Sequence, residues 1–494
     1  MSEFSRHQRA LVYLALASAR LYARLGKPQR GVRAQRGMAM LWALIVFSIL
    51  TVSVVDFLDE TRVNYALAVN QADDTKAYFN AQSGINLQLM GLLFQKELMQ
   101  DPTLGRMVRS ANLQVWEFMS LLLPIFVDGQ LNTALGSIRT RSPEELYDGP
   151  YAEPGEVEFQ RPEPEEGKIN LNAFASPDIN RELIQRFCHM IAPPQFERSL
   201  SISDSQAIED RFKVIAAIVD YVDPDEDQTI IDSDCEITTG SAGGESLIYR
   251  DVDYKAKNQP FTTLGELRLI PLVSDAFMEQ FGDKLTVYPV ADNALYINQA
   301  DATVLMGFLC SHFQGVDADS SFTPCTMPQV SYEVSRLALA LDGYIRFFQN
   351  PLNVLMFYLG GMGGLSGDSG RLAEGLGAGQ MQAFRRPQQL QTIIQSIMQN
   401  PQFEWFFLSQ ADTSELGTLE LQQALQNGQM GLLPVYTFTA DNFDFTRMAR
   451  NISTSTPQVF TLTSSGTQRN IRRTIRTVVD VSGEEPRILY WREF

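Results

Sequence analysis

The stretch QRGMAMLWALIVFSIL, residues 35–50, decides how the rest of the chain is interpreted. It opens an uncharged run of 18 residues that extends from Met38 to Val55 and stops at Asp56. At a rise of about 1.5 Å per residue, a helix over this run is about 27 Å long, close to the thickness of a bilayer core. The run is a signal peptide, a transmembrane anchor or part of a processing site. A signal peptide is disfavoured, because the run does not end in a small-residue cleavage pattern.

The charge of the chain is acidic and unevenly distributed. Its 494 residues carry a formal net charge of −18, and 45% of them are hydrophobic, as in an ordinary globular protein. Acidic charge without a basic patch argues against nucleic-acid binding. Residues 1–37, in contrast, carry eight Arg or Lys and one Glu. Such a flank is expected to stay in the cytoplasm while the remainder crosses the membrane.

The apolar run continues into an amphipathic segment. No proline follows Met38 until Pro102. Apolar residues recur at every fourth position along one helical face: Ala77, Ala81, Ile85, Leu89 and Leu93. The pattern predicts one helix from the apolar run to about Leu98, apolar at first and amphipathic later. This is the build of a type IV pilin spine.

The residues around Gly37 resemble a prepilin processing site. The resemblance implies that a prepilin peptidase cuts after Gly37 and that the new N-terminal residue, Met38, is N-methylated. Most members of the family carry a glutamate five residues after the cut, where this chain has Trp42. The minor pseudopilin K of type II secretion systems (general secretion pathway protein K) characteristically lacks this glutamate. The segment YFNAQSGIN, residues 78–86, also resembles that family.

Residues 169–325 are predicted to form an inserted, mainly helical domain. Two similar units, INLN at 169–172 and INQA at 297–300, each place a short extended piece before a helix. Thr263 and Glu266 form a predicted capping box. The order of GKINLNA, IVDYVDPDED, NQPFTTLGEL and INQA is similar to that of protein K.

The remaining segments complete a predicted pilin domain. Residues 38–99 are its spine, 100–168 a loop region with an edge strand, and 326–432 a helical insertion with a flexible glycine-rich loop at 360–379. Residues 433–494 alternate polar and apolar side chains and predict an antiparallel sheet of three or four strands. The predicted segments of this sheet are 433–442, 458–467, 471–482 and 486–494. The expected fold class is therefore α+β, a type IV pilin-like fold with a large inserted helical domain.

An acidic segment, DPDEDQTIIDSDCE at 223–236, holds seven carboxylates within fourteen residues. Alternating Asp residues bind calcium in EF-hand loops, but Gln228 replaces the required glycine and Asp234 the bidentate glutamate. A solvated acidic loop is the alternative. The resemblance to protein K implies that the inserted domain binds calcium. The predicted ligands are Asp223, Asp225, Asp227, Asp232, Asp234, Glu245, Asp251 and Asp253.

The cysteines and histidines do not indicate catalysis. None of the four cysteines, Cys188, Cys235, Cys310 and Cys325, belongs to a CxxC motif. In an exported domain, Cys310 and Cys325 are expected to close a local disulfide, and four free thiols are the alternative. The three histidines lack an activating neighbour in the sequence, so no enzymatic activity is expected.

The sequence thus predicts a minor pseudopilin at the tip of a type II secretion pseudopilus. The resemblance implies several partners: I- and J-type minor pseudopilins, the major pseudopilin, prepilin peptidase and the inner-membrane secretion platform. It places the chain in the inner membrane of a Gram-negative cell as a single-pass protein, with its bulk in the periplasm. A minor pilin of a type IV pilus and an uncleaved, membrane-anchored periplasmic adaptor are the alternatives.

Overall fold

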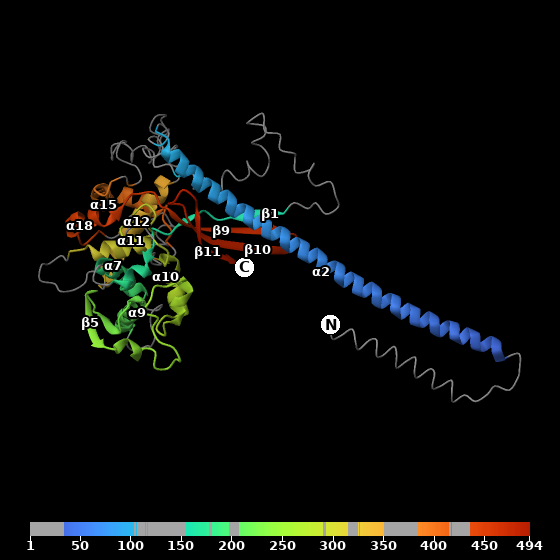
Figure 1. The fold of residues 1–494 in the computed structure, drawn as a ribbon. Helices are drawn as coiled ribbons and strands as arrows, with labels where there is room; N and C mark the ends of the chain where they lie inside the picture. Colours follow the sequence, from blue (N-terminus) through green and yellow to red (C-terminus); the bar gives the residue numbers. More distant parts are fainter. Residues whose placement is uncertain are drawn as a thin grey trace. The chain divides into compact units, whose positions relative to one another are not determined.

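The computed structural model describes residues 34–102, 155–176, 180–196, 207–289, 293–314, 327–349, 386–413 and 435–494 (Figure 1). It also describes six isolated residues: Gly105, Gln114, Trp116, Cys325, Phe384 and Leu416. The basic leader up to residue 33, most of the loop region 100–168 and the glycine-rich loop 360–379 lie outside the described residues. The chain divides into two units, residues 1–73 and 74–494, and each is described by itself.

The first unit contains the beginning of helix α2 (Ala34–Gln100). Among the described residues, this is the one helix long and apolar enough to cross a membrane, with a mean hydropathy of 2.5 over its most apolar window. Two hydroxyl groups in its apolar part bond locally, because Ser48 and Thr51 donate to the carbonyl oxygens four residues earlier, each at 2.8 Å. Such bonds suit a helix in lipid, where no water is available.

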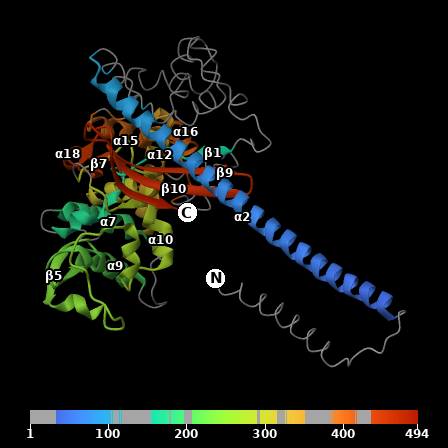
Figure 2. The ribbon, with the colours of Figure 1, turned by 45° about the vertical axis from the view of Figure 1, so that its right-hand side comes forward.

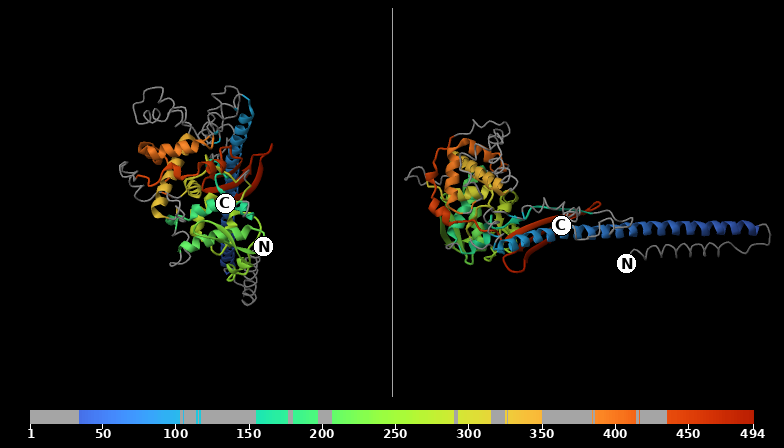
Figure 3. Two further views of the ribbon diagram at one scale, coloured as in Figure 1. Left: turned by 90° about the vertical axis from the view of Figure 1, so that its left-hand side faces the viewer. Right: turned by 90° about the horizontal axis from the view of Figure 1, so that it is seen from above.

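In the second unit, residues 74–100 of α2 pack against an antiparallel sheet (Figures 2 and 3). Ala81 and Ile85 lie in one cluster with Leu462 and Ile475 of the sheet. Gly466 permits a close approach of helix and strand, because a Cβ atom there would lie 2.1 Å from the Ala77 carbonyl oxygen. The predicted face therefore meets the sheet as far as Leu89, and beyond it Leu92 rather than the predicted Leu93 lies in the cluster.

The sheet joins strands from two distant parts of the chain. It contains β1 (Glu156–Phe159), β2 (Glu163–Pro164), β9 (Val459–Gln468), β10 (Ile471–Asp480) and β11 (Arg487–Glu493). Their order is β1-β9-β10-β11, with β2 also paired to β9, and all pairings are antiparallel. Because β2 and β9 are neighbours, residues 165–458 form an insertion between two strands of one sheet.

Three of the four predicted C-terminal strands are present, but the prediction of a strand at 433–442 is wrong. Residues 440–442 form the 3₁₀ helix η9 (Ala440–Asn442) instead. Phe438 and Phe443 are buried against Phe313 in the helical core, with ring centroids 4.9 and 5.2 Å from it. The alternating aromatic side chains of this segment thus serve the insertion rather than the sheet.

The insertion is mainly helical. Its described helices are η2 (Leu171–Ala175), α7 (Arg181–Ile191), η3 (Pro194–Phe196), α9 (Ala207–Val222), η4 (Gly244–Leu247), η5 (Leu264–Leu269), α10 (Asp275–Phe281), η6 (Gly282–Lys284), α11 (Ala302–Ser311), α12 (Pro328–Gln349), α15 (Gln389–Gln399), α16 (Pro401–Leu408), η9 and α18 (Phe445–Arg450). Three short strand pairs accompany them: β3 (Ile169–Asn170) with β6 (Leu285–Thr286), β4 (Asp227–Ile231) with β5 (Ile237–Ala242), and β7 (Leu295–Tyr296) with β8 (Ile452–Ser453).

One hydrophobic core serves the whole insertion. It extends from Ile169 to Ile452 and includes residues of α12, α15 and α16. The described helices of 326–432 therefore share a core with residues 169–325. The predicted capping box of Thr263 and Glu266 is confirmed and begins η5. The fold as a whole confirms the predicted class: an α+β, pilin-like arrangement of a long N-terminal helix and a C-terminal sheet, interrupted by a helical insertion.

Candidate cation site

Three carboxylates gather at the C-terminal end of α9. Asp220 lies in the last turn of this helix, Asp223 follows it directly, and Glu245 belongs to η4. One oxygen of each lies within 4.8 Å of the others. The three residues are only 1%, 2% and 3% exposed, respectively. Because hard divalent cations prefer several oxygen ligands, this group is the candidate cation site.

Local structure brings the three residues together. After Asp223 the chain forms the β4–β5 hairpin and returns to α9. Gly243 then adopts a φ of 73°, a left-handed conformation that glycine tolerates without strain, and begins η4. Asp220 Oδ1 accepts a hydrogen bond from the Thr229 backbone N at 2.8 Å, which fixes the hairpin to the helix. Asn258 Nδ2 donates to Glu245 Oε2 at 3.2 Å.

The electrostatics of the group favour a bound positive charge. Burial, together with neighbouring carboxylates, raises the pKa of Asp223 to about 8, that of Glu245 to about 7 and that of Asp220 to about 6. One oxygen of each carboxylate has no hydrogen-bond partner among the described residues: Asp220 Oδ2, Asp223 Oδ1 and Glu245 Oε1. A divalent cation would supply the missing partner and hold all three groups in the charged form.

The predicted ligands separate into two groups. Asp223 and Glu245 belong to the cluster, and the exposed Asp225 is close enough that its charge raises the pKa of all three members. The structure does not bring the other predicted ligands into the cluster: Asp227, Asp232, Asp234, Asp251 and Asp253. Asp232 instead shapes the hairpin turn, where Oδ1 accepts from the backbone N of Asp234 and of Glu236, both at 2.9 Å.

Sequence reasoning missed Asp220 as a member of the carboxylate group. Its position three residues before Asp223 places both carboxylates on neighbouring positions of one helix end. This spacing is visible in the sequence, but the pattern that indicated calcium ligands was the alternation of carboxylates in residues 223–236. The return of Glu245 through a left-handed glycine could not be derived from the pattern.

Two disulfides brace the insertion. The structure joins Cys310 to Cys325, the pair expected from the sequence, and also Cys188 to Cys235. The second pair ties the turn of the β4–β5 hairpin to α7. The hairpin beside the carboxylates is therefore held at one side by Asp220 and at the other by a covalent bond.

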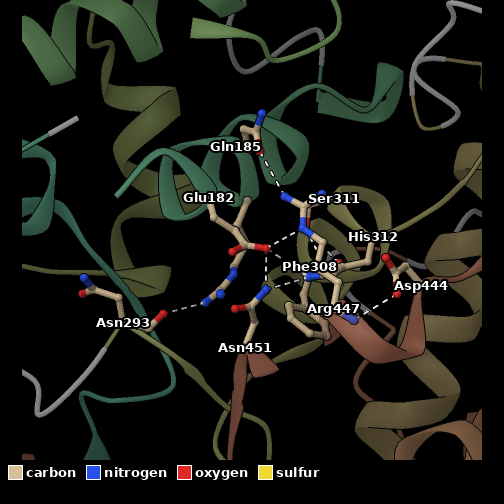
Figure 4. Close-up of polar contacts among 10 residues, drawn as sticks. Glu182, Gln185, Asn293, Phe308, Ser311, His312, Asp444, Arg447 and Asn451 are labelled. Atoms are coloured by element: carbon tan, nitrogen blue, oxygen red, sulfur yellow. Dashed lines mark hydrogen bonds and ion pairs between the residues drawn. The ribbon is translucent and has the colours of Figure 1, made fainter. Parts of the chain in front are cut away.

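A second polar cluster links α7, α11 and α18 (Figure 4). Glu182 Oε1 accepts from Arg447 Nε at 2.8 Å and lies 3.4 Å from His312 Nε2, and hydrogen bonding from His312 and Arg447 lowers the pKa of Glu182 to about 2. Ser311 Oγ lies 2.9 Å from His312 Nδ1, but the hydroxyl donates to the Phe308 carbonyl oxygen, also at 2.9 Å. The serine proton is thus directed at its own helix, and the cluster is a link between helices.

Comparisons with known proteins show a structural likeness. No family model and no curated protein matches the chain. Among solved structures, the chain is similar to one from the crystal structure of the GspK–GspI–GspJ complex of the type 2 secretion system of enterotoxigenic Escherichia coli. The likeness has 14% sequence identity and a TM-score of 0.34, and it covers 76% of this chain and 95% of that one.

Proposed function

We propose that this chain is a minor pseudopilin of a type II secretion system. In this proposal it occupies the tip of the periplasmic pseudopilus and helps to initiate its assembly and protein export. One observation carries the proposal: a single helix, α2, begins with a membrane-length apolar segment and continues into a half whose small residues pack under an antiparallel sheet. A simple membrane anchor does not require this continuous connection between the span and the folded domain.

Trp42 supports a place at the tip. In pseudopilins the glutamate at this position neutralises the N-terminal amine of the adjacent subunit, and an unpaired charge in lipid is costly. A subunit with Trp42 lacks that carboxylate and does not need to dock beneath another subunit. The large insertion of residues 165–458 would also obstruct further subunits above it. Both features favour the subunit that starts the fibre.

We also propose that calcium occupies the carboxylate group of Asp220, Asp223 and Glu245. Support comes from the burial of the three side chains and from the oxygen of each that lacks a partner among the described residues. A periplasmic protein is exposed to millimolar calcium, at which even a weak site is filled. The role of the ion in this proposal is structural, since no catalytic role is proposed for the chain.

The proposal implies a set of partners and a location. Prepilin peptidase would cut after Gly37 and leave a methylated Met38, and the inner-membrane platform would then draw the helix into the pseudopilus. The solved complex to which the chain is similar contains GspK, GspI and GspJ. I- and J-type minor pseudopilins are therefore the first partners to test, followed by the major pseudopilin. The chain would lie in the inner membrane with its bulk in the periplasm.

Mass spectrometry of the N-terminus tests the central claim. The full chain, expressed with active prepilin peptidase, should begin at a methylated Met38, and without the peptidase it should keep its leader. An intact N-terminus in both strains would contradict the proposal and favour the uncleaved adaptor. Replacing Gly37 by a bulkier residue should block the cut and serves as the matched control.

A second measurement separates a type II secretion pseudopilin from a type IV pilus minor pilin. Deletion of the chain should stop secretion of the exported enzymes of the bacterium and leave surface pili unchanged. Trp42→Glu should leave secretion at the wild-type level, because the tip position does not need this carboxylate. A requirement for Glu at this position would contradict the tip assignment.

A further inference from the structure

The arginines of the C-terminal sheet differ in whether they have a carboxylate partner. Three of them have one within the same unit: Arg472 with Glu158 at 2.9 Å, Arg473 with Asp74 at 2.5 Å, and Arg487 with Asp480 at 2.5 Å. Arg476 of β10 and Arg492 of β11 have none among the described residues. These two arginines therefore carry positive charge that the described part of the subunit does not neutralise.

Arg476 and Arg492 also lie side by side. They are directly opposite each other in the β10–β11 pairing and thus project from the same face of the sheet, and both are exposed. Like charges at directly opposed positions destabilise a strand pair. An anion that binds between them would remove this repulsion.

Aromatic rings flank the two arginines on the same face. Tyr490 and Phe494 lie two residues before and after Arg492, so their side chains alternate to its side of the strand. Arg492 Cζ lies 4.6 Å from the centre of the Phe494 ring, which is 54% exposed. Arginine and aromatic residues are enriched at protein interfaces, where they contribute most of the binding energy. We call Arg476, Tyr490, Arg492 and Phe494 the arginine patch.

Three members of the patch, Arg476, Arg492 and Phe494, are exposed, whereas the Tyr490 ring lies 6.4 Å from the ring of Tyr288 in the insertion and forms the covered border of the patch. In the described part of the chain, β11 pairs only with β10 and forms the edge of the sheet. The opposite face, which includes Ile475 and Val479, is buried against α2. A protein docked on the arginine patch would therefore not disturb the packing of the spine.

We propose that the arginine patch binds a carboxylate-bearing surface of a neighbouring minor pseudopilin. Charge complementarity identifies the partner chemistry, because two exposed, directly opposed arginines without a carboxylate partner among the described residues attract an acidic surface. Aromatic rings beside the guanidinium groups favour a protein surface over a free anion, since they contribute apolar contact area as well as charge. The inference rests on the proposed function, which supplies the neighbouring subunit.

Co-purification with the I- and J-type subunits tests the inference. The full chain is expressed with both subunits, extracted in detergent, and its affinity for the I–J pair is measured at several salt concentrations. The double variant R476E/R492E should bind at least about tenfold more weakly, and its binding should lose most of the salt dependence of the wild type. R476K/R492K keeps the charge and should retain most of the affinity.

Arg472→Glu is the matched control, because Arg472 lies on the same strand and face but already pairs with Glu158. If R472E weakens binding as much as the double variant, the loss comes from the change in net charge and not from the two patch arginines. The inference is then overturned. Equal binding by wild type and R476E/R492E, with both folded by circular dichroism, also overturns it. If the wild type fails to bind the I–J pair at all, the proposed function itself fails.

A lipid is the rival occupant of the patch. Vesicles of phosphatidylglycerol and of phosphatidylcholine are offered to the same proteins. If R476E/R492E abolishes binding to phosphatidylglycerol but leaves I–J binding unchanged, the patch binds lipid headgroups and the inference is overturned. Loss of I–J binding without any effect on vesicles supports it.

Discussion

Two regions of the second unit bury carboxylates, and the two regions give these carboxylates different partners. Beside the sheet, Glu165 Oε1 lies 3.0 Å from Lys168 Nζ and accepts from Thr461 Oγ1 at 2.5 Å. Glu166 Oε1 accepts from the backbone N of Gln458 and Val459 at 2.5 and 2.9 Å. In the insertion, the carboxylates of Asp220, Asp223 and Glu245 face one another instead.

The difference shows which region contains its own cation, although Glu166 Oε2 beside the sheet also lacks a hydrogen-bond partner among the described residues. The chain provides the sheet region with its own cation, Lys168, and with backbone donors at the start of β9. It provides the carboxylate group of α9 and η4 with the backbone N of Thr229 and with Asn258, and with no cation among the described residues. Mutation of Lys168 should therefore destabilise the sheet region, and removal of a metal ion should destabilise the region around α9 and η4.

The largest expected effect is the loss of Lys168. Its side chain is 9% exposed, and its ammonium group contacts Glu163 Oε1 at 2.8 Å as well as Glu165. Lys168→Met leaves the buried Glu165 without its cation, and removal of one partner of a buried pair costs about 3 to 5 kcal/mol in the free energy of unfolding. Urea denaturation of the full chain in detergent measures this loss.

Glu163→Gln is the control for this prediction, because the Glu163 side chain is 48% exposed and its pairing with Lys168 is worth about 1 kcal/mol or less. If K168M and E163Q unfold at the same urea concentration, the pair beside the sheet is not the source of stability that its burial indicates.

Calcium removal should have the next largest effect. A ligand at a hundred times its dissociation constant stabilises the folded state by about 2.7 kcal/mol, so a chelator should lower the melting temperature of the wild type. Asp223→Asn should abolish this calcium dependence. In chelator the same variant should be at least as stable as the wild type, because it removes repulsion from Asp220 and Glu245.

Asp234→Asn provides the contrast, since Asp234 is an exposed member of the same acidic loop but lies outside the carboxylate group. It should keep the full calcium response. A response lost equally in D223N and D234N would indicate diffuse charge screening rather than a site.

The sequence allowed more to be predicted for the sheet region than for the insertion. The spine helix, its buried face and three strands could be predicted from hydrophobic periodicity. In a helix or strand that packs on one side, apolar side chains recur at a regular spacing, and this spacing is visible in the sequence. Asp220 could not be assigned, since its role depends on a hairpin and a left-handed glycine that return Glu245 to the helix. The prediction of a strand at 433–442 was wrong for a related reason. Alternating aromatic and polar residues indicate that one side of a segment is buried, but they do not show whether that side packs in a sheet or against a helical core.

The smallest expected effect concerns the pH dependence of Glu166. Burial raises the pKa of this carboxyl from 4.5 to about 7, although the backbone donors of Gln458 and Val459 oppose the shift. Between these two pKa values the folded state binds more protons than the unfolded state, so this group makes stability fall as the pH rises from 4.5 to 7. Glu166→Gln cannot titrate, and the variant should therefore lose less stability over this range, by on the order of 1 to 2 kcal/mol.

Denaturation at pH 5 and pH 8 measures this difference. Saturating calcium is added so that the carboxylate group of Asp220, Asp223 and Glu245 stays charged at both pH values. Glu182→Gln is the control, because the pKa of Glu182 is lowered to about 2 and this carboxyl therefore stays charged in the folded state at both pH values. A stability difference between wild type and E166Q that stays constant with pH would mean that the two backbone donors outweigh burial. Glu166 would then be charged at both pH values. Its burial would not make the free energy of unfolding depend on pH.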